Sequence, residues 1–164
     1  MRISRLLPIT SLLILLSGFS LAVQAAEATI RITSIAQVEV EVVNNGIKEI
    51  KRVSPEKTIP GTEVIYTNTF ENISSKTASD IVINNPIPGN TEFKSGSAFG
   101  KDCAIVFSAD GGKTFGVAEK LKIKGADGKE YTALPGQYTH IRWIYKGQLA
   151  DGKSGEVGFR AVIK

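Results

Sequence analysis

Apolar and polar residues alternate along most of this chain, and this period of two constrains the fold more than any other feature. Valine and glutamate alternate over Val38–Val42, and residues 157–163 repeat the pattern with larger apolar side chains. Successive side chains of a β-strand point to opposite faces, so the pattern predicts strands with one buried face. No segment keeps a helical period over three turns, although 117–121 could form a single turn.

Turn residues separate the strands. Residues 44–46, Asn-Asn-Gly, predict a tight hairpin that folds 47–53 back onto the preceding strand, because Asn-Gly supplies the positive φ angles of such a turn. Pro60-Gly61 predicts a turn before a strand over 64–70. Asn68 interrupts the apolar face of that strand, so its amide must find hydrogen-bond partners inside the protein.

Further strands are predicted downstream. One covers 81–83 and is expected to stop before Pro86, and another starts near Thr91. A short apolar strand is expected over Cys103–Phe107. Residues 120–131 predict an outer hairpin whose alternating lysines protect an exposed sheet edge.

The segment Thr-His-Ile-Arg-Trp-Ile-Tyr, residues 139–145, predicts an inner strand with Ile141, Trp143 and Tyr145 towards the core. His140 and Arg142 lie on its other face. With about eight short strands in all, the sequence favours an all-β fold, and we expect an antiparallel β-sandwich.

The N-terminus has the three parts of a secretory signal. Arg2 and Arg5 precede an apolar stretch, and small residues end at Val23-Gln24-Ala25. We expect a signal peptide over 1–25 and a single domain over 26–164, with no membrane span after cleavage. The protein is then exported and is either periplasmic or secreted to the cell surface.

Charge and cysteine content limit the possible functions. Removal of Arg2 and Arg5 lowers Lys plus Arg from 20 to 18 against 16 acidic residues, a net charge of +2, which gives little reason to expect nucleic-acid binding. Cys103 is the only cysteine, so no disulfide can form within the chain. It is expected to be an unpaired, inert thiol, with an intermolecular bridge as the alternative.

Residues 107–115, Phe-Ser-Ala-Asp-Gly-Gly-Lys-Thr-Phe, match the Asp-box signature best known from sialidases. Sialidases carry several such boxes in a β-propeller, which a single domain with one copy cannot build. The motif is interpreted as a structural turn. Asp110 can accept hydrogen bonds from backbone amides, Gly111 and Gly112 permit positive φ, and Phe115 can pack beneath the hairpin.

No catalytic or metal-binding constellation is evident. His140 is the only histidine, and one histidine with one cysteine is too few for a zinc site. The Asp-Gly turns lack the spacing of a calcium loop. We therefore predict no catalytic residues, no cofactor and no metal. Two alternatives stay open: a surface loop that binds calcium, and a glycan platform formed by Trp143, Tyr145 or Tyr138.

Three stretches resemble, in order and spacing, the bacterial surface-protein repeat module catalogued as domain of unknown function eleven. They are PGTEVIYTNTFEN, ASDIVINNPIPGNTEFKSGSA and IRWIYKGQLADGKSGEVGFRAVI, within Lys51–Lys164. The chain has Asn85 before Pro86 where the family usually has aspartate, and it holds one copy rather than a tandem array. The resemblance implies an immunoglobulin-like sandwich of the bacterial cell envelope and no catalytic residues.

These observations favour a non-catalytic structural or protein-interaction module of the cell envelope, which offers edge strands or loops to an unidentified protein partner. A small carbohydrate-binding β-sandwich is the alternative. It would need exposed aromatic side chains that stack on sugars. A hydrolase is the third hypothesis, and it has no motif to support it.

Overall fold

The computed structural model describes residues 29–164, so the predicted signal peptide lies outside the described residues. The fold is all-β, with two short 3₁₀ turns, η1 and η2. One sheet has the order β2-β1-β3-β11-β5, with β6 also paired to β11, and a three-stranded sheet has the order β4-β10-β7. Every pairing is antiparallel. The elements are β1 (Ile30–Asn44), β2 (Ile47–Val53), β3 (Glu63–Asn72), β4 (Val82–Pro86), β5 (Thr91–Phe93), β6 (Phe99–Gly100), β7 (Cys103–Ser108), η1 (Ala118–Lys120), β8 (Lys122–Lys124), β9 (Glu130–Thr132), η2 (Pro135–Gln137), β10 (His140–Tyr145) and β11 (Ser154–Ile163).

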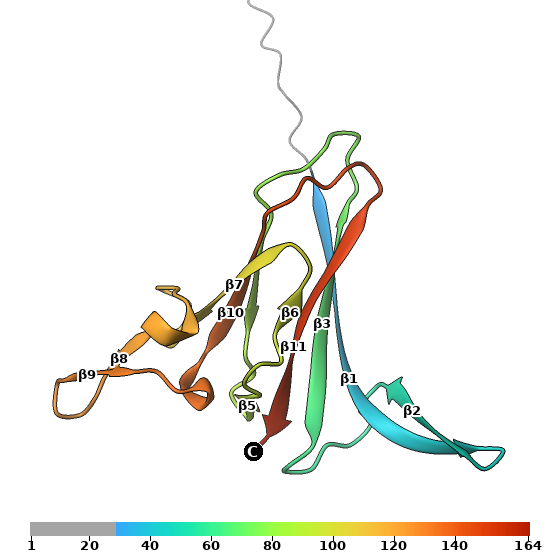
Figure 1. Ribbon diagram of the computed structural model, residues 1–164, viewed down its shortest axis with the longest axis horizontal. Coiled ribbons are helices and arrows are strands. Elements are labelled where there is room, and N and C mark those ends of the chain that lie inside the picture. Colours follow the sequence, from blue (N-terminus) through green and yellow to red (C-terminus); the bar gives the residue numbers. More distant parts are fainter. Residues whose placement is uncertain (1–28) are drawn as a thin grey trace, which may run out of the picture.

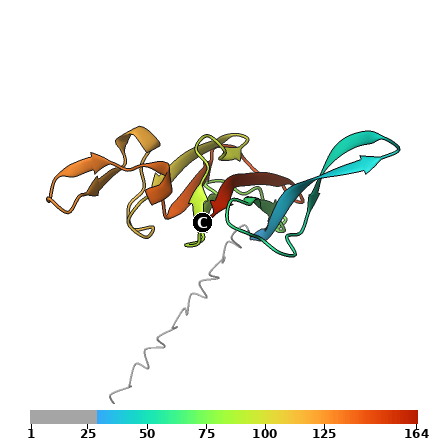
Figure 2. The same cartoon turned by 90° about the horizontal axis from the view of Figure 1, so that it is seen from below.

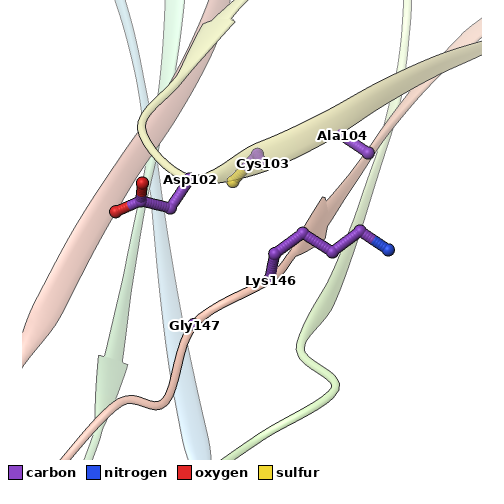
Figure 3. Close-up of a pocket in the computed structure, with 5 residues that line it drawn as sticks. All are labelled: Asp102, Cys103, Ala104, Lys146 and Gly147. Carbon is purple, nitrogen blue, oxygen red and sulfur yellow. The ribbon is translucent and has the colours of Figure 1, made fainter.

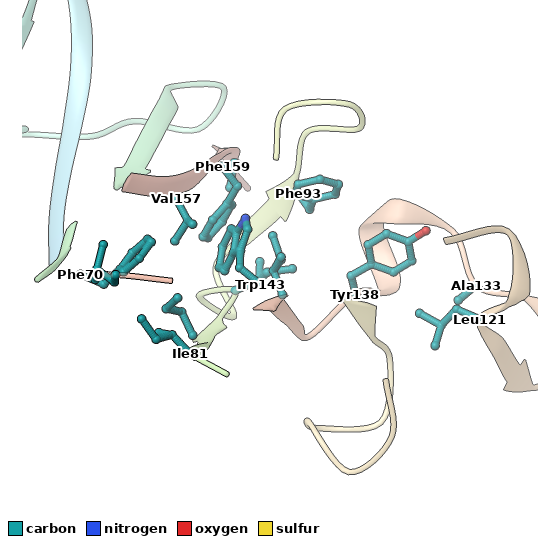
Figure 4. Close-up of a cluster of buried hydrophobic side chains, with 14 of the residues drawn as sticks. Phe70, Ile81, Phe93, Leu121, Ala133, Tyr138, Trp143, Val157 and Phe159 are labelled. Carbon is teal, nitrogen blue, oxygen red and sulfur yellow. The ribbon is translucent and has the colours of Figure 1, made fainter. Parts of the chain in front are cut away.

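The two larger sheets enclose the core in the manner of a sandwich (Figure 1). Trp143 and Ile141 from β10 and Val157 and Phe159 from β11 are completely buried. The aromatic rings of Trp143 and Phe159 lie 6.3 Å apart between centroids. The core continues past Phe93 towards the β8–β9 hairpin (Figure 4). The inward placement of the odd-numbered residues on β10 and β11 is therefore confirmed.

The strand order can be compared with the immunoglobulin sandwich, in which strands A, B, E and D face strands C, F and G. Here β1, β3 and β5 occupy the positions of A, B and D, and β4 and β10 occupy those of C and F. The last strand, β11, fills the E position, and β7 fills the G position. The layout is thus sandwich-like, while the two strands at E and G come in the opposite chain order.

The predicted turns and strands agree with the structure in most places. The β1–β2 hairpin turns at Asn45 and Gly46, both with positive φ, and Asn44 pairs with Ile47. The strand expected over 81–83 instead covers Val82–Pro86. Pro86 fits inside it because β4 is an edge strand, where a missing N–H costs no ladder hydrogen bond. Eleven strands form rather than about eight, since several are only two or three residues long.

The side-chain amide of Asn68 finds the hydrogen-bond partners that its buried position requires. Its side chain is 3 % exposed. The Ser34 hydroxyl donates to its Oδ1 over 2.5 Å, and its own Nδ2 donates to Asn85 Oδ1 over 3.4 Å. These bonds link β1, β3 and β4, so the buried amide joins the two sheets near their edge.

Candidate functional site

The β1–β2 hairpin projects from one end of the sandwich, and β8–β9 projects from the opposite end (Figures 1 and 2). Among residues 29–164, β2 pairs with β1 alone, and its outer edge meets no other strand. We call this outer edge of β2, Ile47–Val53, the open edge. All seven of its residues are exposed. The open edge is the longest stretch of exposed strand in the described part of the chain.

The hairpin and the strand that carries it also concentrate exposed apolar side chains. Of the thirteen exposed large hydrophobic residues found in residues 29–164, six lie on β1 or β2. They are Ile32, Ile35, Val43, Ile47, Ile50 and Val53. Ile50, at the centre of β2, is 64 % exposed. Scattered exposed apolar residues are ordinary, but three of these six lie on β2 beside its unpaired edge, and such a group is typical of an interaction surface.

Backbone groups on the open edge are available for pairing. In a two-residue hairpin the residues that flank the turn form a hydrogen-bonded pair, and such pairs then occur at every second position. Because Asn44 pairs with Ile47, the amides of Glu49 and Lys51 point towards β1. The N–H and C=O groups of the alternate residues 48, 50 and 52 therefore point outwards, which is the arrangement that accepts an added strand.

Ion pairs fix the base of the hairpin to the sandwich. Arg160 on β11 forms a bidentate contact with Glu39 on β1, at 2.9 Å and 3.0 Å, and a further bond of 2.7 Å to Glu63 on β3. Arg52 on β2 also donates to Glu39, at 3.2 Å, and Lys94 pairs with Glu63. The planar guanidinium of Arg160 suits a bidentate contact, so it holds one orientation of the hairpin base.

These contacts change the acid–base behaviour of Glu39. The hydrogen bonds from Arg160 are the main cause, with a further contribution from Arg52, and together they lower the pKa of Glu39 to about 2. Lys94 and Arg160 likewise lower the pKa of Glu63. Both carboxylates are therefore ionised at neutral pH, where they pair with the neighbouring cations.

The Asp-box segment forms a closed turn after β7. Asp110 Oδ1 accepts hydrogen bonds from the amides of Lys113 and Thr114, at 3.1 Å and 3.0 Å, and Oδ2 accepts one from the Thr114 hydroxyl at 2.6 Å. The Ser108 hydroxyl donates to Oδ1 as well. Thr114 is the main cause of a strongly lowered Asp110 pKa. Gly111 and Gly112 both adopt positive φ.

Phe115 follows the turn and meets the three-stranded sheet. Its ring lies under the guanidinium of Arg142, with Cζ 3.6 Å from the ring centroid. Arg142 Nε also donates to Asn84 Oδ1 over 2.6 Å. Phe115 therefore closes the turn against the outer face of the three-stranded sheet through a cation–π contact.

His140 and Cys103 lie at opposite ends of the paired strands β10 and β7. His140 is half-buried against Gly112, where an added Cβ would lie 3.3 Å from its ring. Cys103 is free and lines an open hollow of about 530 Å³ with Asp102 and Lys146 (Figure 3). Burial and the nearby Asp102 raise the pKa of the thiol, which keeps it protonated and a weak nucleophile.

The aromatic residues considered for a glycan platform do not meet on the surface. Trp143 is fully buried, and Tyr138 is 8 % exposed and stacks on Phe107 at 4.8 Å. Tyr145 packs edge-on against Phe70 inside the sandwich. A cavity of about 290 Å³ between the sheets borders Tyr138, yet its ring faces are already covered by neighbouring rings. These rings form no flat exposed surface for a sugar to stack on.

Two further searches cover residues 29–164. No group of three or more His, Cys, Asp or Glu side chains in that range is placed to hold a metal ion. No helix there is long and apolar enough to cross a membrane.

Comparison of the chain with protein-family models, with curated proteins and with solved structures returns no significant match. The resemblance to the surface-protein repeat module therefore stays a prediction from its motifs.

Some structural residues were not predicted from the sequence. Asn72 is fully buried, and its Nδ2 donates to the carbonyls of Lys76 and Leu149, at 2.6 Å and 2.8 Å. Its Oδ1 accepts from the amide and hydroxyl of Ser74. The Arg160 ion pairs were also missed, because their partners lie 97 and 121 residues away in the chain. Position on the outer face of a strand was the only sequence signal for Arg160.

Proposed function

We propose that this protein is a non-catalytic, exported interaction module of the bacterial cell envelope, and that it binds a protein partner through the open edge of β2. The observation that carries the proposal is a projecting strand with every residue exposed and one edge unpaired. An added strand would satisfy the outward N–H and C=O groups of that edge, while its side chains would cover the exposed Ile47 and Ile50.

The ion pairs at the hairpin base support this function. Strand addition requires an edge held at a defined angle, because a mobile hairpin would lose conformational entropy on binding. Arg160 connects β11 to Glu39 on β1 and Glu63 on β3, so the base of the hairpin is ordered before a partner arrives. The partner then meets a preformed edge.

Site-specific photo-crosslinking in cells that export the protein tests the proposal. A photoreactive residue at position 50 should yield crosslinked adducts whose partners are identified by mass spectrometry. The matched control is position 117, because Val117 is also exposed, at 42 %, and lies outside the hairpin. Recovery of uncrosslinked protein from both positions, or equal adducts from both, would contradict the proposal.

A further inference from the structure

We infer that the open edge of β2 pairs antiparallel with the same edge of a second copy of this chain, around a two-fold axis at Ile50. The inference rests on the proposed function, because both use the open edge, and it names the partner. Symmetric pairing of one edge with itself is the simplest route to a closed dimer. It would join the two six-stranded sheets into one continuous sheet.

The hydrogen-bonding pattern restricts the register of such a pairing. Only residues 48, 50 and 52 direct their N–H and C=O groups outwards, so the two strands can meet only where outward groups oppose outward groups. The two-fold axis must then lie beside one residue, which opposes its own copy, and not midway between two successive residues of the strand. With the axis at Ile50, position 50 opposes its own copy and position 48 opposes position 52. All six outward N–H groups, three from each strand, find an acceptor.

Charge selects one axis among those that remain. An axis at Lys48, Lys51 or Arg52 would place two identical cations directly opposite each other. An axis at Glu49 would do the same with two carboxylates. Like charges directly opposite on paired strands are unfavourable. Ile50 is the only interior position of β2 that is uncharged, and its side chain is exposed.

On one face of the joined sheet the side chains become complementary. Glu49 of one copy opposes Lys51 of the second copy, and the reverse pair forms by symmetry. Ile47 opposes Val53 of the second copy, which brings together side chains that are 65 % and 40 % exposed. Two ion pairs are thus flanked by two apolar pairs, and both kinds of pair stabilise adjacent antiparallel strands.

On the other face the two Ile50 side chains meet at the axis, and Lys48 opposes Arg52 of the second copy. Those cations are already paired within each copy. Lys48 lies 2.8 Å from Glu41, and Arg52 lies 3.2 Å from Glu39. The glutamates on β1 therefore offset the repulsion between the opposed cations. The charges on β2 oppose pairing in other registers, in the way that edge strands avoid nonspecific association.

Charge exchange across the axis tests the register. Sedimentation of the purified exported protein over a wide range of concentration should show a reversible dimer. Glu49→Lys places two lysines opposite each other and should weaken the dimer by about 10-fold or more. The double variant Glu49→Lys/Lys51→Glu restores both ion pairs and should recover most of the affinity. Glu156→Lys is the matched control, because it makes the same change of charge at an exposed residue of β11 that pairs with Thr69, away from the open edge.

The outcomes separate this inference from the proposed function. Rescue by the double variant supports pairing at Ile50. A monomer at every concentration, or a dimer that Glu49→Lys leaves unchanged, overturns it. Circular dichroism and thermal unfolding of each variant show whether a lost dimer reflects lost folding, and Ile50→Lys gives a second disruption of the axis. If the protein is monomeric, crosslinking from position 50 to a different protein still decides the proposed function by itself.

Discussion

At the scale of single residues, two short polar side chains organise the loops by taking up backbone groups. The exposed carboxylate of Asp110 accepts hydrogen bonds from backbone amides in the turn that follows β7. The buried side-chain amide of Asn72 donates hydrogen bonds to loop carbonyls. Asn72 also begins the triplet Asn72-Ile73-Ser74, which matches a glycosylation acceptor. Because the Asn72 side chain is fully buried with both of its ends bonded, it is closed to modification in the folded protein.

Replacement of Asp110 tests its role in the turn. Asp110→Ala should lower the melting temperature, because the amides of Lys113 and Thr114 lose their acceptor. Asp110→Asn retains one acceptor oxygen and should fall between alanine and the natural residue. The matched control is Asp151→Ala, since Asp151 also precedes a glycine with positive φ but its side chain has no hydrogen bond to any residue within 29–164. Equal melting temperatures for Asp110→Ala and the unaltered protein would refute the structural role.

Replacement of Asn72 should have a larger effect. Asn72→Ala removes four hydrogen bonds of a fully buried side chain, two donated to the carbonyls of Lys76 and Leu149 and two accepted from Ser74, which costs about 1 to 3 kcal/mol of unfolding free energy. Urea denaturation measures the change. Ser74→Ala is the control, because it removes only one half-buried hydroxyl of the same hydrogen-bond network and should cost less. A smaller loss for Asn72→Ala than for Ser74→Ala would show that the buried amide is unimportant.

At the scale of elements, the ion pairs of Glu39 make the attachment of the hairpin depend on pH. The folded-state pKa of about 2 lies below the ordinary value of 4.5, so the carboxylate stabilises the folded state above pH 4.5. That stabilisation is lost as the pH falls from 4.5 towards 2. Glu39→Gln should therefore be less stable than the unaltered protein at pH 7 and equally stable near pH 2. A difference in unfolding free energy that stays constant between those pH values would contradict this account.

The pairing of β11 with β3 depends on the absence of a side chain at Gly158. A Cβ there would lie 2.5 Å from the backbone oxygen of Tyr66 and 2.6 Å from the Phe99 ring. Because the backbone of β3 cannot move without loss of its ladder, Gly158→Ala should cost about 1 to 3 kcal/mol. Gly89→Ala is the matched control, since nothing lies within 4 Å of its Cβ position. Similar melting temperatures for the two variants would count against this packing.

The alternation of side chains was enough to predict the strands and hairpins, because burial on one face is a local property of the pattern. The Asn-Gly dipeptide identified the turn at Asn45-Gly46, and the alternation placed Trp143 in the core. It did not reveal that β11 lies between β3 and β5, since any strand with one apolar face could fill that position. Nor did it reveal the exposure of β2, because Val38–Val53 has the same pattern whether its hairpin is covered or projects.

At the scale of the whole molecule, the structure is a sandwich that carries a projecting strand with one unpaired edge at one end. Strands β3, β4, β5, β10 and β11 contribute buried side chains to the core, while β2 contributes no buried residue. A strand that adds so little to the core is free to pair outside the molecule. The predicted export signal over 1–25 adds a separate expectation: the intact mass of the exported protein should correspond to cleavage after Ala25. An uncleaved mass would contradict the signal peptide.

Hydrogen exchange of the β2 backbone amides, measured residue by residue at rising protein concentration, tests the proposed pairing of the open edge most directly. At low concentration the amides of Glu49 and Lys51 should be protected by β1, while those of Lys48, Ile50 and Arg52 exchange quickly. At high concentration the second set should become protected as well. Fast exchange at positions 48, 50 and 52 at every concentration would contradict pairing of the open edge with a second copy.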